Sequence, residues 1–441
     1  MSSDCYSVTP VQTVAPFSVT VPGSKSITNR ALLLAALSDG PCTLKNALFS
    51  SDSRALIASL TALGFDCTAD EETKTIQITG YNGSIPNKEA TVNVQSAGTA
   101  ARFLTALLAF CDGSYTLLAS EQMKKRPMAP LISSLRDLGV TVTCLEAEGH
   151  LPLLLQGGAS VIKEAPSLSV SIDQSSQFLS ALMMAGVVLP EGLFVTATGS
   201  RTALSYVTIT ERMMQDFGVT PEASLSAAGE PCYRIPGATG YRHGTYVIEP
   251  DLSGACYFYA AAALLGTSVT VNGVHPDSIQ GDYRFLDALA QLGCTVCDTP
   301  AGVCVTGPAD RRYPGLTITM SDFSDQTMTM AVLALFADSP THIRGVGHIR
   351  GQECDRMSAI ITEIRRLGGI AEIDEDGTGI IITPAPLTGT TLETYDDHRM
   401  AMSLALIGLR VAGVTISNPS CCKKTFENYF ELFTDCFAQP K

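Results

Sequence analysis

Long hydrophobic runs are missing from this chain of 441 residues. The longest apolar stretches, residues 178–190 and 255–266, fall short of the roughly 18 to 20 residues that a membrane-spanning helix needs. The first residues, MSSDCYSVTP, contain no basic residue and lead into no apolar stretch, so no secretory or transit signal is recognisable. We therefore expect a cytoplasmic protein with no membrane partner.

Positive charge is also scarce. The chain has 29 lysines and arginines against 43 aspartates and glutamates, a formal net charge of -14. Because nucleic-acid binding depends on basic surface, nucleic acid is not expected as a partner. Hydrophobic residues make up 45% and charged residues 16%, which is typical of a globular protein and not of a disordered chain or a coiled coil. Any anion site must therefore be a local cluster of cations.

Common nucleotide and metal motifs are absent as well. The segment PGSKS (22–26) lacks the G-x-x-x-x-G-K-[ST] spacing of a phosphate loop, and no G-x-G-x-x-G follows a predicted strand. Cys294 and Cys297 form a C-x-x-C, but strand alternation should point them to opposite faces and no second pair of ligands accompanies them. These absences exclude a P-loop kinase, a dinucleotide-binding fold and a zinc site of this type.

What the chain does contain is a repeat of about 75 residues. One part of the unit is a small-residue turn, an apolar helix, a break and a strand; its copies begin at Ser26, Gly98, Ser175, Ser253, Gln326 and His398. The other part is an amphipathic helix closed by a glycine suited to the left-handed conformation, followed by a strand. These closing glycines are Gly64, Gly139, Gly218, Gly293 and Gly368.

Six repeats predict two similar domains of three units each. A sixth amphipathic helix is expected from Lys424, but the chain ends there, so we expect the N-terminal segment VQTVAPFSVTV (11–21) to supply its strand. The domains would then be residues 23–243 and residues 1–22 plus 244–441. A structural solenoid without chemistry is the alternative interpretation.

Cations recur near the predicted helix starts. A cation in a first turn opposes the helix dipole unless an anion compensates it, and the free N–H groups there favour anions. If the units are arranged alike, the helix starts of each domain converge and bind small phosphate-bearing anions. The cations concerned are Lys25, Arg30, Arg102, Arg126, Arg356, Arg399 and Lys424.

The motifs PGSKSITNRALLLAAL, SAGTAAR, MKKRP, SSQFLSAL, ECDR, DDHRMAMSLAL and KTFENYFELF follow one another along the whole chain. Through them the chain resembles the 5-enolpyruvylshikimate-3-phosphate synthase family of enolpyruvyl transferases. The resemblance implies an inside-out α/β fold, in which each domain has three copies of a βαβαββ-type unit with helices buried in the middle.

The resemblance also implies an activity in the shikimate pathway, which leads to chorismate and the aromatic amino acids. The enolpyruvyl group of phosphoenolpyruvate would pass to the 5-hydroxyl of shikimate 3-phosphate by addition and elimination, with release of inorganic phosphate. Such an enzyme needs no metal and no organic cofactor, and we expect a monomer acting on small anionic substrates.

Carried over by motif, shikimate 3-phosphate would be bound mainly by the domain 23–243. Three residues are candidates for one phosphate contact, Ser200, Arg201 and Tyr206, since a length change leaves the alignment there open. The full set is Lys25, Ser26, Arg30, Ser175, Ser176, Gln177, Ser200, Arg201, Tyr206, Asp325 and Gln352.

The other domain would hold the catalytic carboxylates and the clamp for the phosphoenolpyruvate carboxylate. Planar guanidinium forks suit such a clamp, which would be Arg356 and Arg399. Phosphoenolpyruvate would contact Lys25, Gly98, Arg126, Gln177, Arg356, Arg399 and Lys424. Glu353 is the expected proton donor to the methylene, Asp325 and Lys25 would handle the hydroxyl proton, and His398 would support them.

Some positions depart from the family pattern. Gln352 stands where many relatives carry lysine, His348 where many carry asparagine, and Phe103 where proline is frequent. Gly98 leaves room beside phosphoenolpyruvate, which predicts inhibition by glyphosate. Two alternatives stay open: UDP-N-acetylglucosamine 1-carboxyvinyltransferase, whose loop cysteine is absent from EQMKKRP, and a non-catalytic anion-binding protein, which would not need both carboxylates.

Overall fold

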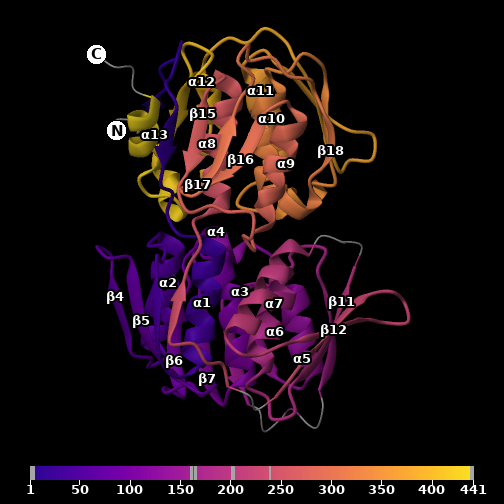
Figure 1. The fold of residues 1–441 in the computed structure, drawn as a ribbon. Helices are drawn as coiled ribbons and strands as arrows, with labels where there is room; N and C mark the ends of the chain where they lie inside the picture. The colour runs from indigo at the N-terminus through magenta and orange to yellow at the C-terminus, as the bar shows by residue number, and fades with distance from the viewer. Residues whose placement is uncertain (1–4, 159–161, 163–165, 200–203, 238–239, 438–441) are drawn as a thin grey trace. The chain divides into compact units, whose positions relative to one another are not determined.

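A computed structural model describes residues 5–158, 162, 166–199, 204–237 and 240–437 (Figure 1). The chain divides into two compact units, residues 23–248 and residues 1–22 with 249–441. Within the described ranges no helix is both long enough and apolar enough to cross a membrane.

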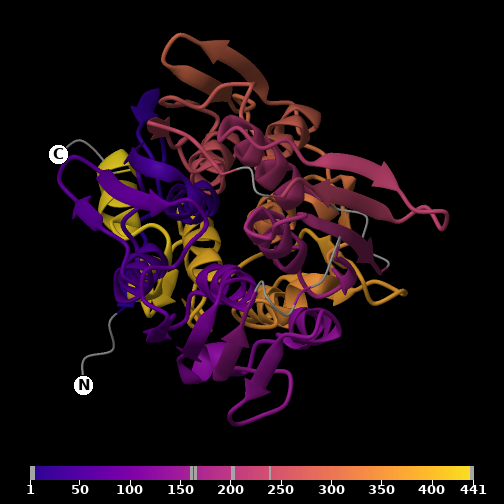
Figure 2. The same ribbon diagram turned by 90° about the horizontal axis from the view of Figure 1, so that it is seen from below.

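The unit 23–248 contains three four-stranded sheets of one design. In each, a strand pairs in parallel with the strand that follows a buried helix, and an antiparallel hairpin completes the sheet. The hairpin of β12 and β13 extends outward from its unit (Figure 2). In spatial order the sheets are β14 (Thr245–Val247), β3 (Asp39–Lys45), β5 (Thr75–Tyr81), β4 (Cys67–Asp70); β6 (Glu89–Asn93), β7 (Gly113–Leu118), β9 (Leu153–Gly157), β8 (Thr141–Cys144); and β10 (Ser167–Ser171), β11 (Leu193–Thr198), β13 (Pro231–Ile235), β12 (Glu222–Leu225).

Three helices form the centre of this unit. Nearly every residue of them is buried, which explains why they are apolar on all sides and not amphipathic. The outer helices bury only one face, as their sequence pattern predicts. The central helices are α1 (Lys25–Leu37), α3 (Gly98–Phe110) and α6 (Gln177–Gly186); the others are α2 (Ser51–Ala62), α4 (Glu121–Lys124), α5 (Ala129–Asp137) and α7 (Ser205–Asp216).

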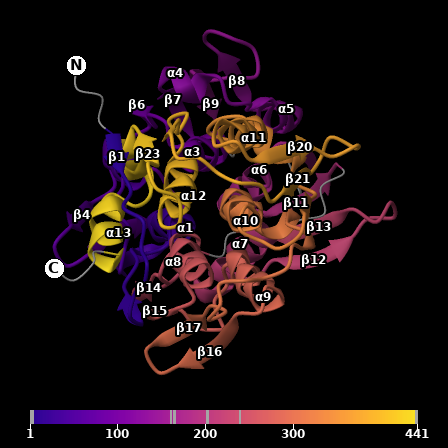
Figure 3. The ribbon, with the colours of Figure 1, turned by 90° about the horizontal axis from the view of Figure 1, so that it is seen from above.

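The second unit follows a similar plan, with α8, α10 and α12 packed together inside three sheets, of which two have four strands and one has three (Figure 3). Its sheets are β16 (Thr295–Thr299), β17 (Gly302–Thr306), β15 (Ser268–Val271), β2 (Phe17–Val19); β18 (Thr317–Thr319), β19 (Thr341–Arg344), β21 (Ile380–Thr383), β20 (Ile370–Ile373); and β1 (Cys5–Ser7), β23 (Thr415–Ser417), β22 (Thr391–Leu392). Its helices are α8 (Leu252–Leu265), α9 (Arg284–Gln291), α10 (Thr327–Ala334), α11 (Arg356–Arg366), α12 (His398–Gly408) and α13 (Tyr429–Phe437), with the 3-10 helices η1 (Gly281–Tyr283), η2 (Ser321–Gln326), η3 (Gly347–Gly351) and η4 (Pro419–Lys424).

The N-terminal segment pairs differently from the prediction. Strand β2, within the segment expected to complete the sixth repeat, pairs in parallel with β15 of the fourth repeat, so that prediction was wrong. The sixth repeat instead receives β1, which pairs antiparallel with β23. Likewise β14, which leads into α8, pairs with β3 in the unit 23–248. The strands that precede α1 and α8 are therefore exchanged, and this pairing puts the unit boundary after residue 248 and not after 243.

Candidate active site

Arg30 connects three helices of the unit 23–248, namely α1, α6 and α7. Its Nε donates to Thr210 Oγ1 at 2.8 Å and its Nη1 to the Ser26 carbonyl at 3.1 Å. Its Nη2 donates to Ser180 Oγ at 3.3 Å and to the Tyr206 carbonyl at 3.0 Å. Burial lowers the pKa of Arg30 to about 10. Since a guanidinium has five N–H groups, these contacts fix its place between α1, α6 and α7 and leave little donor capacity for a ligand.

The starts of α3 and α6 meet through a second arginine. Arg102 Nη1 donates to Gln177 Oε1 at 2.6 Å, and Gln177 Nε2 donates to Thr99 Oγ1 at 3.4 Å. A Cβ added at Gly98 would lie 2.5 Å from Arg126 Nη1. The structure thus brings together Gly98, Arg126 and Gln177, which were predicted to contact phosphoenolpyruvate, and adds Arg102, to which the sequence assigned no contact.

The remaining predicted residues of this unit lie at other helix starts. Lys25 is the first residue of α1, and its Nζ is 3.7 Å from Asp52 Oδ2. Ser175 Oγ accepts from the Gln177 amide at 3.2 Å, and Ser176 directly precedes α6. Ser200 and Arg201 lie outside the described residues, so the choice between them and Tyr206 stays open.

In the second unit, Arg356 is the centre of an ion-pair network. Its side chain is 1% exposed and opens α11. It contacts Asp397 Oδ2 at 2.8 Å through Nε, Asp325 Oδ1 at 3.0 Å through Nη1 and Glu353 Oε2 at 2.9 Å through Nη2. Burial works against its charge, but Asp397, Glu353 and Asp325 together raise the pKa of the guanidinium above its usual value. This arginine therefore stays cationic.

Two further cations complete this network. Arg399 Nη2 donates to Asp325 Oδ2 at 2.8 Å, and Lys424 Nζ lies 3.2 Å from Glu353 Oε1. Each predicted catalytic carboxylate is therefore held between two cations: Asp325 by Arg356 and Arg399, and Glu353 by Arg356 and Lys424.

Three more residues named in the sequence analysis lie next to members of this network. His398 opens α12 and is 1% exposed, with Nδ1 3.7 Å from Asp397 Oδ1. Gln352 directly follows η3 and precedes Glu353. His348 Nε2 lies 2.8 Å from Ser324 Oγ, beside Asp325.

The dipole argument from the sequence holds for some of these cations only. Lys25, Arg356 and Arg399 are in first turns, as predicted. Arg126 lies between α4 and α5, and Lys424 is the last residue of η4, so for these two it was wrong. Arg30 and Arg102 lie about one turn inside their helices, beyond the first turn. In the second unit the charge compensation comes from the protein's own carboxylates.

Sequence analysis missed the carboxylates that support this network. Asp397 caps α12 and bonds Arg356, and it was visible only as the middle of YDDHR. Asp282 lies in the short 3-10 helix η1; burial, and then the charge of Asp325, raises the pKa of this carboxyl to about 6. Neither residue carries a signal in the sequence that separates it from an ordinary helix cap.

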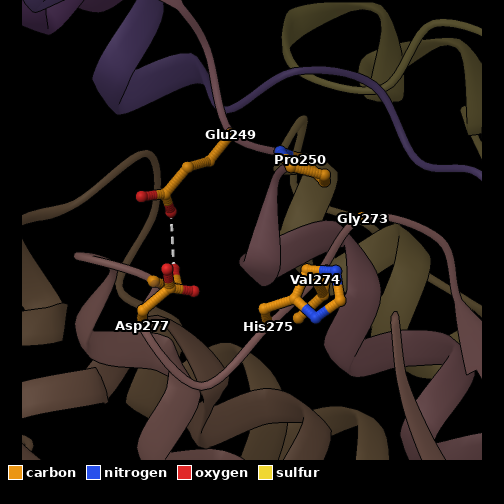
Figure 4. A pocket seen from close by; sticks show the side chains of 7 residues that line it. Glu249, Pro250, Gly273, Val274, His275 and Asp277 are labelled. Carbon is orange, nitrogen blue, oxygen red and sulfur yellow. Dashed lines mark hydrogen bonds between the residues drawn. The ribbon is translucent and has the colours of Figure 1, made fainter. Parts of the chain in front are cut away.

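A small pocket elsewhere in this unit has no predicted site residue. It is lined by Glu249, Pro250, Gly273, Val274, His275, Asp277 and Ser278, and Ser278 Oγ donates to Glu249 at 2.6 Å (Figure 4). Among the described residues there is no cluster of three or more histidine, cysteine, aspartate or glutamate side chains suited to a metal ion.

Comparison with known proteins adds a family to this geometry. A family model described as EPSP synthase (3-phosphoshikimate 1-carboxyvinyltransferase) matches residues 12–433. The 3-phosphoshikimate 1-carboxyvinyltransferase of Nostoc sp. is 40% identical over 415 residues, which cover 94% of this chain and 95% of the relative. That of Methanoregula boonei is 38% identical over 426 residues, or 96% of this chain and 98% of the relative.

Solved structures agree in fold. EPSP synthase from Acinetobacter baumannii aligns with a TM-score of 0.79 over 98% of both chains at 21% identity. The enolpyruvyl transferase NikO from Streptomyces tendae aligns with a TM-score of 0.74 over 98% of this chain and 97% of the other, at 18% identity. The predicted enolpyruvyl transferase-like α/β fold is therefore confirmed.

Proposed function

This chain belongs to the EPSP synthase family, and we propose that its cations bind the substrates of enolpyruvyl transfer while its carboxylates move the protons. The enzyme transfers the enolpyruvyl group of phosphoenolpyruvate to shikimate 3-phosphate and releases inorganic phosphate. It acts on small anions; a cytoplasmic location and a monomeric state stay predictions.

One observation carries the assignment of roles. Asp325 and Glu353, an expected base and an expected acid, share one network with Arg356, Arg399 and Lys424. Arginine pairs would suffice to bind an anion, whereas proton transfer needs carboxyl groups held beside them. This combination favours an enzyme over a non-catalytic anion-binding protein.

The internal ion pairs suggest how Glu353 becomes an acid. The carboxylate of phosphoenolpyruvate would bind the forks of Arg356 and Arg399, which now hold Glu353 and Asp325. Loss of a cationic partner and arrival of an anion both favour the protonated form of a carboxyl group. Substrate binding would thus raise the pKa of Glu353 and allow it to carry a proton.

The reaction then proceeds in two balanced steps. Glu353 gives its proton to the methylene carbon, the 5-hydroxyl oxygen bonds to the adjacent carbon, and Asp325 with Lys25 takes the hydroxyl proton. The resulting tetrahedral intermediate loses phosphate when the carbon–oxygen bond to that group breaks. A methyl proton returns to Glu353, which restores the double bond, and His398 supports this group.

The other predicted residues would bind the substrates. In the unit 23–248, shikimate 3-phosphate would contact Lys25, Ser26, Arg30, Ser175, Ser176, Gln177 and one or more of Ser200, Arg201 and Tyr206; the phosphate of phosphoenolpyruvate would contact Lys25, Gly98, Arg126 and Gln177. In the other unit, Asp325 and Gln352 would contact shikimate 3-phosphate, and Lys424 the phosphate of phosphoenolpyruvate. Because four donor contacts of Arg30 are internal, its contribution would be mainly to hold Ser26 in place.

Phosphate release in the presence of both substrates tests this proposal. Glu353→Gln and Asp325→Ala should each lower kcat by about 100- to 10,000-fold, the usual contribution of a general acid or base. Glu372→Gln, which changes an exposed carboxylate on β20, is the matched control and should keep full activity. Unchanged turnover in either catalytic variant would contradict the assigned roles.

A further inference from the structure

Asp282 is a buried carboxyl group among the central helix starts of the second unit. It lies in η1 and is 6% exposed. Its Oδ2 accepts a hydrogen bond from Ser253 Oγ, at the start of α8, and one of 3.0 Å from the Nε2 of Gln326, the residue that directly precedes α10. Both donors therefore converge on one oxygen atom.

Each of these donors leads to a residue of the proposed reaction. Ser253 Oγ accepts from Arg399 Nη2 at 3.4 Å while it donates to Asp282, so its orientation is set from both sides. Gln326 is the neighbour of Asp325 in the chain, and Asp325 accepts from the same Arg399 nitrogen at 2.8 Å. A rotation of Ser253 or Gln326 would therefore disturb the ion pair of Arg399 and Asp325.

Gln326, which donates to Asp282, is also connected to α12 through buried hydroxyl groups. Gln326 Oε1 accepts from Thr329 Oγ1 at 3.1 Å, and Thr329 Oγ1 lies 3.2 Å from Ser403 Oγ. Ser403 is one turn beyond Arg399 on α12. The starts of α8, α10 and α12, which pack side by side in Figure 3, thus share a polar network that meets at Asp282.

We propose that Asp282 is a positioning residue for enolpyruvyl transfer, which holds Arg399 and Asp325 in place through Ser253 and Gln326. The inference rests on the proposed function. Asp282 touches neither substrate and gives up no proton in the reaction; it orients the arginine that binds the phosphoenolpyruvate carboxylate and the carboxylate that accepts the hydroxyl proton.

The charged surroundings explain why this orientation needs a fixed acceptor. From η2, Asp325 faces Asp282 and repels its charge; from α12, Arg399 attracts it. Cys256 of α8 lies 3.9 Å from the Asp282 carbonyl, and Asp251 caps the same helix. Arg399 is attracted by both Asp325 and Asp282. The hydrogen bonds of Ser253 and Gln326 to Asp282 keep Arg399 directed at Asp325.

Steady-state kinetics with both substrates varied will test the inference. Asp282→Ala removes the acceptor and should lower kcat/KM for phosphoenolpyruvate by about 10- to 100-fold, the scale of one lost hydrogen bond to a charged group. Asp282→Asn keeps an oxygen atom that can accept both bonds, so it should stay within about threefold of the wild-type value. Asp287→Asn on α9, an exposed position, is the control and should be unchanged.

A double-mutant cycle separates positioning from a general loss of stability. If Asp282 acts through Arg399, then Asp282→Ala should cost little in a chain that already carries Arg399→Ala, and the two losses will not multiply. Multiplying losses, wild-type kinetics of Asp282→Ala, or a loss in Asp282→Asn as large as in Asp282→Ala would each overturn the inference. If Asp282→Ala fails to fold, Ser253→Ala breaks the same connection and takes its place in the cycle.

Failure of the proposed function would look different. It would show as absence of phosphate release by the wild-type enzyme with the two substrates, before any variant is compared. The inference on Asp282 fails only when the wild-type enzyme turns over and the variants depart from the pattern described.

Discussion

At the scale of single residues, the second unit holds Asp325 and Glu353, the proposed catalytic carboxylates, among cations and buries a further acid, Asp282. A buried charge is costly unless hydrogen bonds and opposite charges compensate it. Here two hydrogen bonds and Arg399 do so incompletely, since burial and the charge of Asp325 still raise the pKa of Asp282 to about 6.

This shift predicts a pH dependence of stability. The native pKa is above the value of about 3.9 expected in the unfolded chain, so the native state binds more protons between these values. The free energy of unfolding should therefore fall as pH rises from 4 to 6. Replacement by Asp282→Asn should remove this term, and urea unfolding should show the variant gaining roughly 2 kcal/mol relative to wild type between pH 4 and 7.

Asp287→Asn serves as the control for this measurement, because its carboxylate is exposed and its change should leave the pH profile as in the wild type. Parallel curves for the wild type and Asp282→Asn would show that the buried acid has no raised pKa.

Gly98 gives a second prediction at this scale. A Cβ there would lie 2.5 Å from Arg126 Nη1 and 3.2 Å from Arg102 Nη1, so Gly98→Ala must displace the Arg126 guanidinium. We expect glyphosate to inhibit the wild-type enzyme in competition with phosphoenolpyruvate. In Gly98→Ala, inhibition should weaken and the KM for phosphoenolpyruvate should rise about tenfold, the loss expected for one weakened charged contact.

Inhibition kinetics of Gly244→Ala provide the control, because a Cβ at that glycine meets no atom within 4 Å. Unchanged inhibition of Gly98→Ala would show that the arginine adapts without cost.

At the scale of elements, the loop before α12 is strained and held by a buried acid. Tyr395 and Asp396 both have φ of 55°, a left-handed conformation that is unfavourable for side chains other than glycine. Glu363 of α11, which is fully buried, accepts from Tyr395 Oη at 2.7 Å and from the Glu393 amide at 3.0 Å. Asp397, which follows this loop directly, accepts a hydrogen bond from Arg356.

Removal of this acceptor should loosen the loop and the network. Glu363→Ala removes the acceptor of both bonds, whose donors water can then reach, so we expect a loss of about 1 to 3 kcal/mol in the free energy of unfolding. Tyr395→Phe removes one of these bonds and should cost about 1 kcal/mol. Chemical unfolding measures both, and a Glu363→Ala variant as stable as the wild type would contradict the role of this contact.

At the scale of the whole molecule, the exchanged strands mean that one continuous segment of the chain can complete its sheets by itself and the other cannot. Residues 23–248 contain every strand of three sheets, including β14. Residues 249–441 lack β1 and β2, which belong to two sheets of their unit.

This topology predicts the behaviour of fragments. Residues 23–248 should fold when expressed alone, with cooperative thermal unfolding, since all three sheets keep their strands. Residues 249–441 should not, because β15 and β23 would each expose an unpaired edge. Circular dichroism of both fragments checks this, with the full chain as reference; cooperative unfolding of residues 249–441 would show that the N-terminal strands are dispensable.

Much of this molecule could be predicted from local pattern. Apolar helices such as α3 could be predicted from their residues, and Gly64, with φ of 92°, closes α2 as predicted. These features depend on residues close together in the chain, where spacing and backbone preference decide the conformation. Lys25, Arg356 and Arg399, which lie in first turns, could be placed for the same reason. That the apolar helices lie in the middle of each domain was implied only by the family resemblance.

What only the tertiary structure decided is pairing over long separations. The partner of β2 is β15 and not the sixth repeat, and the counter-ions of Arg356 are Asp325, Glu353 and Asp397. Any of several strands or carboxylates satisfied the local pattern equally well. The choice depends on how the chain closes its sheets and which buried charges must then be neutralised together, and that is a property of the packed molecule.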